Sequence, residues 1–460
     1  MDMKVLKVEN TTEAVTVTTT GAMYKIYKNS VGTIECYQRI GKQRLLATMR
    51  LNSTLENLEV DHFDDNKCIL YKPLYALGVN IRINADSSMY LRTYATVKVV
   101  YNSTWSPEYF SVEQQNFIAI DPHGGIAGYT LPTVGNGGVS EINNAGTGVG
   151  KDGWAVTFSI TYGQQFITSV FPPREYDHKK AYTHRIVHHL VSRENNTTWT
   201  PYLSDNEIRK YSKYGNVLVL HWWSKGFATR KGKAIKSRND IYKTEAAWSS
   251  YKYLPINPRK LQQVLTTAHK HRMKVIAYMT PFFYPGDLLE FIPELKRVVK
   301  TYGFDGIYFD GVPTDVVQAH TVMRETRKVL GNKLFYVHMP SPIITKDYSG
   351  GRYVYFPFID TYADYILRAE HVLSFTKQYL RYVISGYNIS NAVGFVCNYD
   401  YSPDFVKKLI PDILKSQVRI PYWTGWEVYL KELGKNYFPE DKMHEVMHKH
   451  YFPALRKTKV

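Results

Sequence analysis

The stretch Tyr302-Gly303-Phe304-Asp305-Gly306-Ile307-Tyr308-Phe309-Asp310-Gly311-Val312 decides the fold of the second half of the chain. An apolar helical pattern runs into it and ends at Gly303, and a buried-strand pattern follows at 306–309. Asp310 stands at the carboxyl end of that strand, where α/β barrels mount their catalytic side chains. The stretch therefore predicts a β–α unit that ends in a functional acid, whereas Asp305, which precedes the strand, is predicted to be structural.

The same β–α alternation extends to both sides of this stretch. Strand-like runs occur at 216–223, 274–279, 334–338, 365–370 and 393–398, with helical patterns between them. One helix is expected to begin at Asn257-Pro258, with Asn as the N-cap and Pro in the first turn. The alternation predicts a parallel sheet, and the length fits closure into a TIM (β/α)8 barrel. An open doubly wound sheet is the alternative, and the missing Gly-x-Gly-x-x-Gly at the first strand counts against it.

The first two hundred residues instead show β patterns. Apolar and polar residues alternate strictly at 79–84 and at 154–161, and no convincing helix interrupts the series. We therefore predict a multi-domain β plus α/β protein, in which an N-terminal antiparallel β-sandwich over 1–205 precedes the barrel over 206–435. Residues 436–460 are predicted to form a helical tail that packs on the barrel. The Gly-rich segment 124–153 is predicted to form long loops.

Composition limits the partners of the chain. Its 460 residues include 58 Lys and Arg against 41 Asp and Glu, a net charge of +17, which favours anionic partners. The basic residues are dispersed and no nucleic-acid motif accompanies them, so general solubility or a polyanionic substrate is expected rather than a nucleic-acid groove. No apolar run approaches 18 residues and no signal peptide is seen, so no membrane span and a cytoplasmic, virion or surface location are expected. A bridge between Cys36 and Cys68 stays open.

Polar and aromatic residues gather where six successive predicted strands end. This concurrence predicts one active or binding face. Asp310 and Glu370 are the two acids best placed to act as a catalytic pair, as in glycosidic cleavage, where two carboxylates flank the bond. The predicted substrate-binding residues are His221, Trp222, Trp223, Tyr278, Tyr308, His338, Asn398, Asp400 and Trp423. Core packing is the alternative for each aromatic.

Metal and cofactor chemistry is not expected. His221 and His338 lack a short ligand spacing with a partner acid, so hydrogen bonding to sugar hydroxyls, or general acid–base support, is favoured over metal binding for both histidines. No Gly-x-Ser-x-Gly elbow supports serine chemistry.

The barrel half resembles a family of glycoside hydrolases. The residues that carry the resemblance are, in order, 216–223, 275–280 after the helix sequence TTAHKHRMK, Gly303 to Asp310, His338-Met339 and Arg368-Ala369-Glu370. Over about 210–426 the chain is similar to family 123 β-N-acetylgalactosaminidases and their uncharacterised bacterial relatives, and more distantly to the α-galactosidase clan. The resemblance implies a β-sandwich before the barrel and hydrolysis of a glycosidic bond.

One position departs from that family. Its members often place a second acid directly after the strand-end Asp, and family 123 uses the pair for substrate-assisted hydrolysis. Gly311 stands there in this chain, so two adjacent acids are excluded at this strand end. Either Glu370 supplies the second carboxylate, or the barrel only binds glycans.

The leading hypothesis is a glycosidase that acts on an oligo- or polysaccharide, acidic or N-acetylated in character. The rival is a non-catalytic glycan-binding or virion or cell-surface structural protein on a degenerate barrel. A lyase for acidic polysaccharide is a third hypothesis, based on the basic charge of the chain.

Overall fold

The computed structural model describes residues 3–71, 79–113, 116–131, 153–160, 163–176, 182–193, 199–225, 252–282, 284, 287–313, 315–338, 356–368, 375–386, 392–398, 401–425 and 440–458. The chain divides into two compact units. The first comprises Met1–Tyr176, Val354–Thr361 and Gly386–Asn391, and the second comprises Asp177–Tyr353, Tyr362–Ser385 and Ala392–Val460. The predicted combination of antiparallel sheets followed by a parallel sheet with helices is confirmed.

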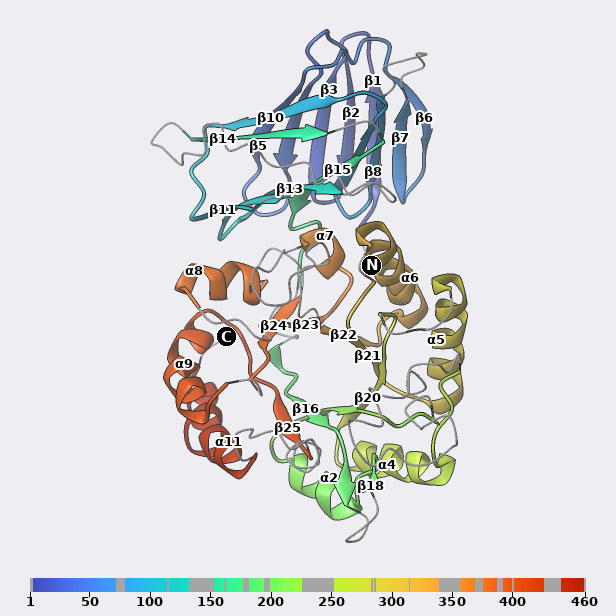
Figure 1. The fold of residues 1–460 in the computed structure, drawn as a ribbon, viewed down its shortest axis with the longest axis vertical. Helices are drawn as coiled ribbons and strands as arrows, with labels where there is room; N and C mark the ends of the chain where they lie inside the picture. The colour runs from blue at the N-terminus through green and yellow to red at the C-terminus, as the bar shows by residue number, and fades with distance from the viewer. Residues whose placement is uncertain are drawn as a thin grey trace. The chain divides into compact units, whose positions relative to one another are not determined.

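Two antiparallel sheets build the first unit (Figure 1). The seven-stranded sheet has the order β1 (Val5–Asn10), β2 (Ala14–Thr19), β3 (Ala22–Tyr27), β4 (Thr33–Gln38), β5 (Arg44–Leu51), β10 (Val97–Ser103), β14 (Trp154–Ile160). The eight-stranded sheet has the order β11 (Tyr109–Glu113), β12 (Asn116–Asp121), β13 (Gly124–Leu131), β15 (Gln165–Phe171), β9 (Ser88–Thr93), β8 (Val79–Asn84), β7 (Lys67–Tyr71), β6 (Glu59–Phe63).

Alternation along the strands explains why these sheets face each other. In β14, every second residue from Trp154 to Ile160 is buried, which gives the strand one apolar face. Tyr101 of the first sheet packs on Phe117 of the second, with ring centroids 4.9 Å apart. Phe158 and Phe166 repeat this contact across the sheets at 5.1 Å. The two inner faces therefore share one core, as in a β-sandwich.

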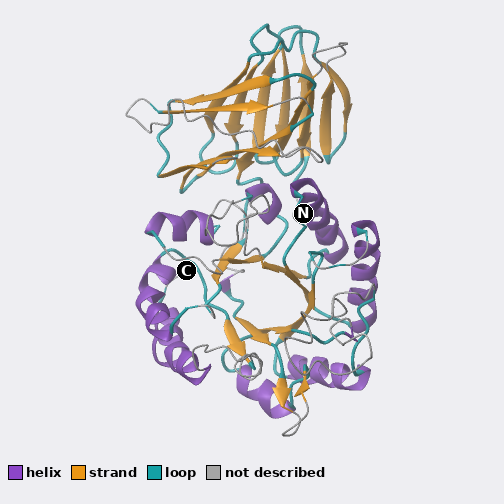
Figure 2. Cartoon of the chain, viewed as in Figure 1, coloured by secondary structure: helices purple, strands orange, loops and turns teal. Residues whose placement is uncertain are grey.

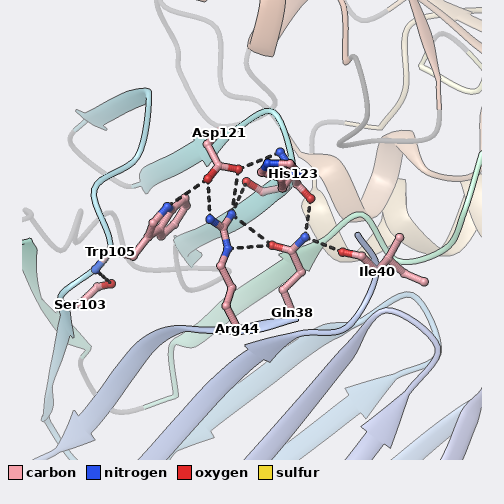
Figure 3. Close-up of polar contacts among 8 residues, drawn as sticks. Gln38, Ile40, Arg44, Ser103, Trp105, Asp121 and His123 are labelled. Atoms are coloured by element: carbon pink, nitrogen blue, oxygen red, sulfur yellow. Dashed lines mark hydrogen bonds and ion pairs between the residues drawn. The ribbon is translucent and has the colours of Figure 1, made fainter. Parts of the chain in front are cut away.

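A charged cluster also joins the two sheets (Figure 3). The guanidinium of Arg44, on β5, donates two hydrogen bonds to the carboxylate of Asp121, on β12, at 2.5 and 2.8 Å. The indole N–H of Trp105 donates to the same carboxylate over 3.1 Å, and the Arg44 guanidinium lies 4.3 Å from the Trp105 ring centroid. The side chains of Arg44 and Asp121 are only 11% and 15% exposed, so the pair is largely shielded from water.

A parallel sheet of eight strands forms the centre of the second unit. Its order is β24 (Val393–Val396), β23 (Tyr365–Arg368), β22 (Leu334–His338), β21 (Gly306–Asp310), β20 (Lys274–Met279), β19 (Val217–Leu220), β16 (Ile186–His189), β25 (Tyr422–Thr424). Figure 2 shows these strands as an inner ring with helices outside it. A separate short ribbon pairs β17 (Ser192–Arg193) with β18 (Trp199–Thr200).

The strand order distinguishes the two predicted topologies. It follows the chain from β16 to β24 without reversal, and the last strand, β25, pairs with the first, β16. A bridge between Phe395 and Arg419 also places the segment before β25 beside β24. An open doubly wound sheet reverses its order at a switch point. The observed order is that of a barrel.

Helices follow the strands, with one departure from a regular repeat. They are α2 (Asp205–Tyr211), α4 (Pro258–Lys270), α5 (Leu288–Tyr302), α6 (Val316–Leu330), α7 (Pro357–Asp360), α8 (Lys377–Tyr379), η3 (Leu380–Ile384), α9 (Pro403–Lys415), α11 (Glu440–Val446), η4 (Met447–Tyr451) and α12 (Phe452–Lys457). The only helix described between β22 and β23 is the four-residue α7, which belongs to the first unit. The (β/α)8 repeat is therefore realised in part.

Local sequence accounts for the ends of these helices. Asn257 caps α4 by accepting a hydrogen bond from the backbone N–H of Lys260, and Pro258 occupies the first turn. Helix α5 ends at Gly303, whose φ of +76° is the left-handed conformation that glycine adopts without strain. That turn leads directly into β21, so the stretch 302–312 forms the predicted helix–turn–strand unit.

Some predictions need correction. The barrel begins before residue 206, because β16 at 186–189 belongs to the parallel sheet. Residues 124–131 form strand β13 rather than a loop, and 132–152 lie outside the described residues. Cys36 and Cys68 are both buried and free, so they form no bridge.

In the C-terminal segment, the hydroxyl of Tyr451 accepts a hydrogen bond from the N–H of Ile420. None of the helices in the described ranges has the length and apolar character that crossing a membrane requires.

Candidate active site

Two neighbouring strands bring an acid and a histidine to the carboxyl end of the parallel sheet. β21 ends at Asp310 and β22 ends at His338, and these two residues are register partners. Oδ1 of Asp310 lies 3.1 Å from Nδ1 of His338. The Asp310 side chain is 30% exposed, whereas that of His338 is 5% exposed. The carboxylate of Asp310 is therefore partly exposed to solvent, whereas the imidazole of His338 that contacts it is buried.

Strand β20 supplies a second donor to the same carboxylate. The hydroxyl of Tyr278 donates to Oδ2 of Asp310 over 2.5 Å. Thr280, just beyond the strand, donates its hydroxyl to the backbone carbonyl of Asp310 over 2.7 Å. The backbone N–H of Thr280 in turn donates to the hydroxyl of Tyr253 over 3.1 Å. The hydrogen bonds from Tyr278, Thr280 and His338 therefore fix both the backbone and the side chain of Asp310.

These contacts decide the protonation states. Burial alone would raise the pKa of Asp310, but hydrogen bonding to His338, the attraction between those two groups and the Tyr278 donor outweigh it. The net pKa of Asp310 lies below its usual value. Burial and the adjacent negative charge raise the pKa of Tyr278 well above 10. Near neutral pH, Asp310 is a carboxylate and Tyr278 is a protonated donor. This arrangement suits a nucleophile or a charge-stabilising group rather than a proton donor.

A cluster around His188 fills the interior of the barrel. Nδ1 of His188, on β16, lies 2.9 Å from Nε2 of His221, and its Nε2 lies 3.1 Å from the Tyr336 hydroxyl. The imidazole stacks on the indole of Trp423, with centroids 3.9 Å apart and planes at 17°. All four side chains are buried. The cluster is a packed polar core beneath the strand ends.

The buried histidines are neutral. Burial lowers the pKa of His188 well below 6.5, and the charges of His221 and His338 act in the same direction. Burial lowers the pKa of His221 to about 3, although the charge of Asp310 opposes the shift. A neutral imidazole offers one donor and one acceptor, so one ring donates to the other in the His188–His221 contact. His221 therefore lies under Asp310 as a fixed neutral group.

Trp223, which the sequence predicts to position a sugar, is a buried residue. Trp223 is 0% exposed, and its indole N–H donates to the carbonyl of Tyr278 over 3.0 Å. Its ring lies 5.0 Å from the ring of Phe304 and 5.5 Å from that of Tyr302, at the end of α5. Contacts with a helix outside the sheet therefore make Trp223 a core residue, which is the alternative role that sequence left open.

The other aromatic candidates differ in exposure. Tyr308 is 1% exposed and packs 5.1 Å from the ring of His188, and its contact with substrate stays a prediction. Trp423 is 8% exposed because His188 covers its face. Trp222, in contrast, is half-buried, with a φ of +50° directly after β19. Phe282, a further aromatic residue three positions after the end of β20, is 36% exposed.

The remaining candidates are placed only in part. Asn398 follows β24 and is 1% exposed, and its Oδ1 has no hydrogen-bond partner among the described residues. Glu370 and Asp400 lie outside the described residues. Asp305, predicted to be structural, accepts hydrogen bonds from the N–H of Val275 and from Nε2 of His269, each over 2.8 Å.

Backbone geometry explains the glycine after the strand-end acid. Gly311 has a φ of +81°, and its N–H donates to the carbonyl of His338 over 3.1 Å. A Cβ at this position would lie 2.9 Å from Cβ of Phe282, closer than such atoms normally approach. An acid at 311 would therefore be strained and crowded. The family's adjacent-acid pair does not fit this turn.

Sequence reasoning missed several residues of this region. His188 and Tyr336 are central to the buried cluster, and Tyr253 accepts the hydrogen bond from the backbone N–H of Thr280, whose hydroxyl contacts Asp310. The available signal was the strand count, since an eight-stranded barrel needs two strands beyond the six predicted. Ile186-Val187-His188-His189 is an apolar pair with two polar residues at its carboxyl end, like the other strands. Among the described ranges, no group of three or more His, Cys, Asp and Glu side chains could hold a metal ion.

Comparisons with known proteins assign no family. No family model matches the chain, and no curated protein matches it either. Similar solved structures include YidC from Thermotoga maritima (11% identity, 37% of this chain and 51% of that chain, TM-score 0.26). They also include a maltogenic α-amylase from Thermotoga neapolitana (12%, 58% and 76%, 0.35) and a dihydrodipicolinate synthetase-like protein from Pseudomonas aeruginosa (8%, 59% and 83%, 0.32). The chain spans about half of YidC, and likenesses this weak support no conclusion about activity.

Proposed function

We propose that the chain is a glycoside hydrolase whose nucleophile or charge-stabilising carboxylate is Asp310. The observation that carries the proposal is the state of that residue. It is an ionised, 30% exposed carboxylate at the carboxyl end of a barrel strand, with Tyr278 and His338 held against its two oxygens. Glycosidic cleavage passes through a positively charged, oxocarbenium-like transition state, which such a carboxylate stabilises.

The second carboxylate of the proposal is Glu370. It follows β23 by two residues, and β23 is separated from β21 only by β22 in the sheet order. In the proposed reaction Glu370 protonates the departing glycosidic oxygen, and Asp310 attacks the anomeric carbon or stabilises its charge. Glu370 then takes a proton from the incoming water. Gly311 excludes the alternative in which the second acid directly follows the first.

The proposed substrate is an oligo- or polysaccharide, N-acetylated or acidic in character. Phe282 and Trp222 retain exposed aromatic surface next to strands β20 and β19, and aromatic faces pack against the apolar faces of sugar rings. The net charge of +17 supports an acidic glycan. The resemblance to family 123 supports an N-acetylated one.

The test is a hydrolysis screen with aryl glycosides and natural glycans, followed by Asp310→Asn and Glu370→Gln. Each variant should lower kcat by roughly 10²–10⁴-fold or more while the fold is retained. Asp441→Asn, on the exposed surface of α11, is the matched control and should retain full activity. Azide added to Asp310→Ala should yield a glycosyl azide if Asp310 is the nucleophile. Full activity in Asp310→Asn would refute the assignment.

A second function is favoured by Gly311. Gly311 directly follows the strand-end acid Asp310, and its turn disfavours a side chain. The barrel therefore lacks the pair of adjacent acids with which family 123, the family it resembles, hydrolyses its substrates. A non-catalytic glycan-binding protein on the same barrel would retain Asp310 as a hydrogen-bond acceptor for sugar hydroxyls. Binding of a glycan in the screen without any turnover would favour this function over hydrolysis.

A further inference from the structure

A cavity lies at the other end of the barrel sheet from Asp310. Its volume is about 700 Å³, in the range of pockets that hold small molecules. Arg185 and Ile186 line it where β16 begins, and Ile420 and Tyr422 line it where β25 begins. Helices η4 and α12 contribute further walls, so the whole cavity belongs to the second unit. Asp310 instead ends its strand, which places the cavity at the amino ends of the strands.

The charge of this cavity is one-sided. Four cationic side chains line it, from Arg185, Lys213, Arg419 and Arg456. The described residues that line it include no Asp and no Glu. Three of the four cations are exposed, and together the four positive charges would attract a small anion to the cavity.

The fourth cation, Arg419, is buried and carries the inference. It is 4% exposed, and no carboxylate pairs with it among the described residues. Its Nη1 donates to the carbonyl of Val418 over 3.1 Å, but its Nε has no hydrogen-bond partner in the described part of the chain. The guanidinium lies 4.3 Å from the ring centroid of Tyr182. One carbonyl and one aromatic face compensate only part of the cost of burying a charge.

The fold itself does not require an arginine at this position. The strand contacts of residue 419 use its backbone, since its N–H donates to the carbonyl of Gly394 and its carbonyl accepts from the N–H of Val396. Any side chain would allow these two bonds. A buried guanidinium in a cavity wall, with no carboxylate partner among the described residues, is therefore better explained by an anion that pairs with it, because the planar guanidinium matches phosphate oxygens with two parallel donors.

Aromatic walls define the rest of the ligand. Tyr182, Tyr214, Tyr422, Tyr451 and Phe452 line the same cavity. We propose that this cavity binds a small phosphate ester that carries a ring, with the phosphate on Arg419 and the ring against the aromatic walls. The site is independent of the proposed hydrolytic site, because it lies at the opposite ends of the strands and shares no residue with it.

Isothermal titration with phenyl phosphate tests the proposal, with inorganic phosphate and phenol as single-component probes. The chain should bind phenyl phosphate more tightly than either component. Arg419→Met should weaken binding at least tenfold, and Arg456→Gln, at the exposed rim, should weaken it less. Arg209→Gln, exposed on α2 and outside the cavity, changes the net charge equally and should leave binding unchanged.

Thermal unfolding without ligand separates a binding role from a structural one. If Arg419 serves an anion, Arg419→Met should unfold at the same temperature as the parent or higher, since an unpaired buried charge has been removed. Equal binding of phenyl phosphate by the parent and Arg419→Met, equal losses in Arg209→Gln and Arg456→Gln, or no binding by the parent would each overturn the proposal. Should Arg419→Met fail to fold, the comparison of Arg456→Gln with Arg209→Gln still decides it.

Discussion

Asp310 and His338 are register partners on adjacent parallel strands, and the same pairing brings their side chains within 3.1 Å of each other. The backbone repeats the link one residue later, where the N–H of Gly311 donates to the carbonyl of His338. The position of the carboxylate is thus a property of the sheet rather than of a loop. Strand scaffolds hold functional groups more precisely than loops do, so the site should tolerate changes at its rim but not in β21 or β22.

Removing the Tyr278 hydroxyl should raise the pKa of Asp310. Tyr278 donates a hydrogen bond to the charged form, and Tyr278→Phe deletes that donor while keeping the ring. The titration of the Asp310 carboxyl carbon, followed by ¹³C NMR, measures the change. Tyr336→Phe is the control, since its hydroxyl contacts His188 rather than Asp310. An unchanged pKa in Tyr278→Phe would show that the hydrogen bond does not hold the carboxylate ionised.

Gly311→Ala should destabilise the barrel more than Gly303→Ala does. Both glycines have a positive φ, +81° and +76°, so both substitutions introduce backbone strain of about 1–2 kcal/mol. A Cβ on Gly303 meets nothing within 4 Å, whereas one on Gly311 also meets Cβ of Phe282 at 2.9 Å. Urea unfolding of the two variants measures the difference. Equal losses would mean that Phe282 moves aside without cost, and that the turn could carry a side chain.

Asp121→Asn should lower the unfolding free energy of the first unit by about 1.5–3 kcal/mol at neutral pH, because it removes a charge-assisted pair with Arg44. Burial would raise the pKa of Asp121, but the hydrogen bonds from Arg44 and from the N–H of His123 outweigh it, and the net pKa is lowered. The stabilisation is therefore present above the unfolded pKa of about 3.9 and is lost as the pH falls through the folded pKa.

Urea unfolding of the parent and of Asp121→Asn at neutral and acidic pH tests this expectation. The free energies of unfolding of the parent and of Asp121→Asn should approach each other below about pH 4. Asp65→Asn is the matched control, since its ion pair with Lys4 is 70% and 55% exposed and should contribute less than about 1 kcal/mol. A difference in unfolding free energy between the parent and Asp121→Asn that stays constant with pH would contradict the expected dependence on the protonation of Asp121.

Acid should weaken the barrel core through its buried histidines. Burial lowers the folded pKa of His188 well below 6.5 and that of His221 to about 3. Below about pH 6.5 the unfolded chain binds protons that the folded chain does not, so the free energy of unfolding decreases as the pH is lowered. Each such histidine contributes up to about 1.4 kcal/mol per pH unit until its folded pKa is reached.

Hydrogen exchange of peptides from β16 and β19, measured from pH 7 to pH 4.5, reports this loss of stability. His188→Phe should make the pH dependence shallower, because it removes one of the protons that the unfolded chain gains. It should also destabilise the core at pH 7, because the Tyr336 hydroxyl and His221 lose their partner. Identical pH dependence in the parent and the variant would mean that His188 does not remain neutral in the folded chain.

Sequence alone predicted the parts of the fold that have a strong local pattern. Helix α5, Gly303 and β21 follow from apolar periodicity, a helix-ending glycine and a short buried run, and these place Asp310 at its strand end. His338 was found in the same way on β22. Such elements are determined by residues within one or two turns of each other, so no knowledge of the tertiary structure is needed to predict them.

The rest depends on contacts between residues that are far apart in the sequence. β16 and β25 are short, with four and three residues, and their mutual pairing joins positions more than two hundred residues apart. The burial of Trp223 likewise depends on Phe304 and Tyr302 at the far end of α5. Sequence also could not show that Nε of Arg419 has no hydrogen-bond partner among the residues that the structure describes, because that depends on which groups the fold brings near it.

The pairing of β16 with β25 has a consequence for how the chain is made. During synthesis β16 emerges long before residues 422–424, so one edge of the growing parallel sheet has no partner until those residues have left the ribosome. Contacts of such large sequence separation form slowly, and open strand edges invite association between nascent chains. Folding of the second unit is thus delayed until residues 422–424 have been synthesised, and a chain truncated before residue 418 should accumulate as aggregate, whereas the sandwich can complete its sheets earlier.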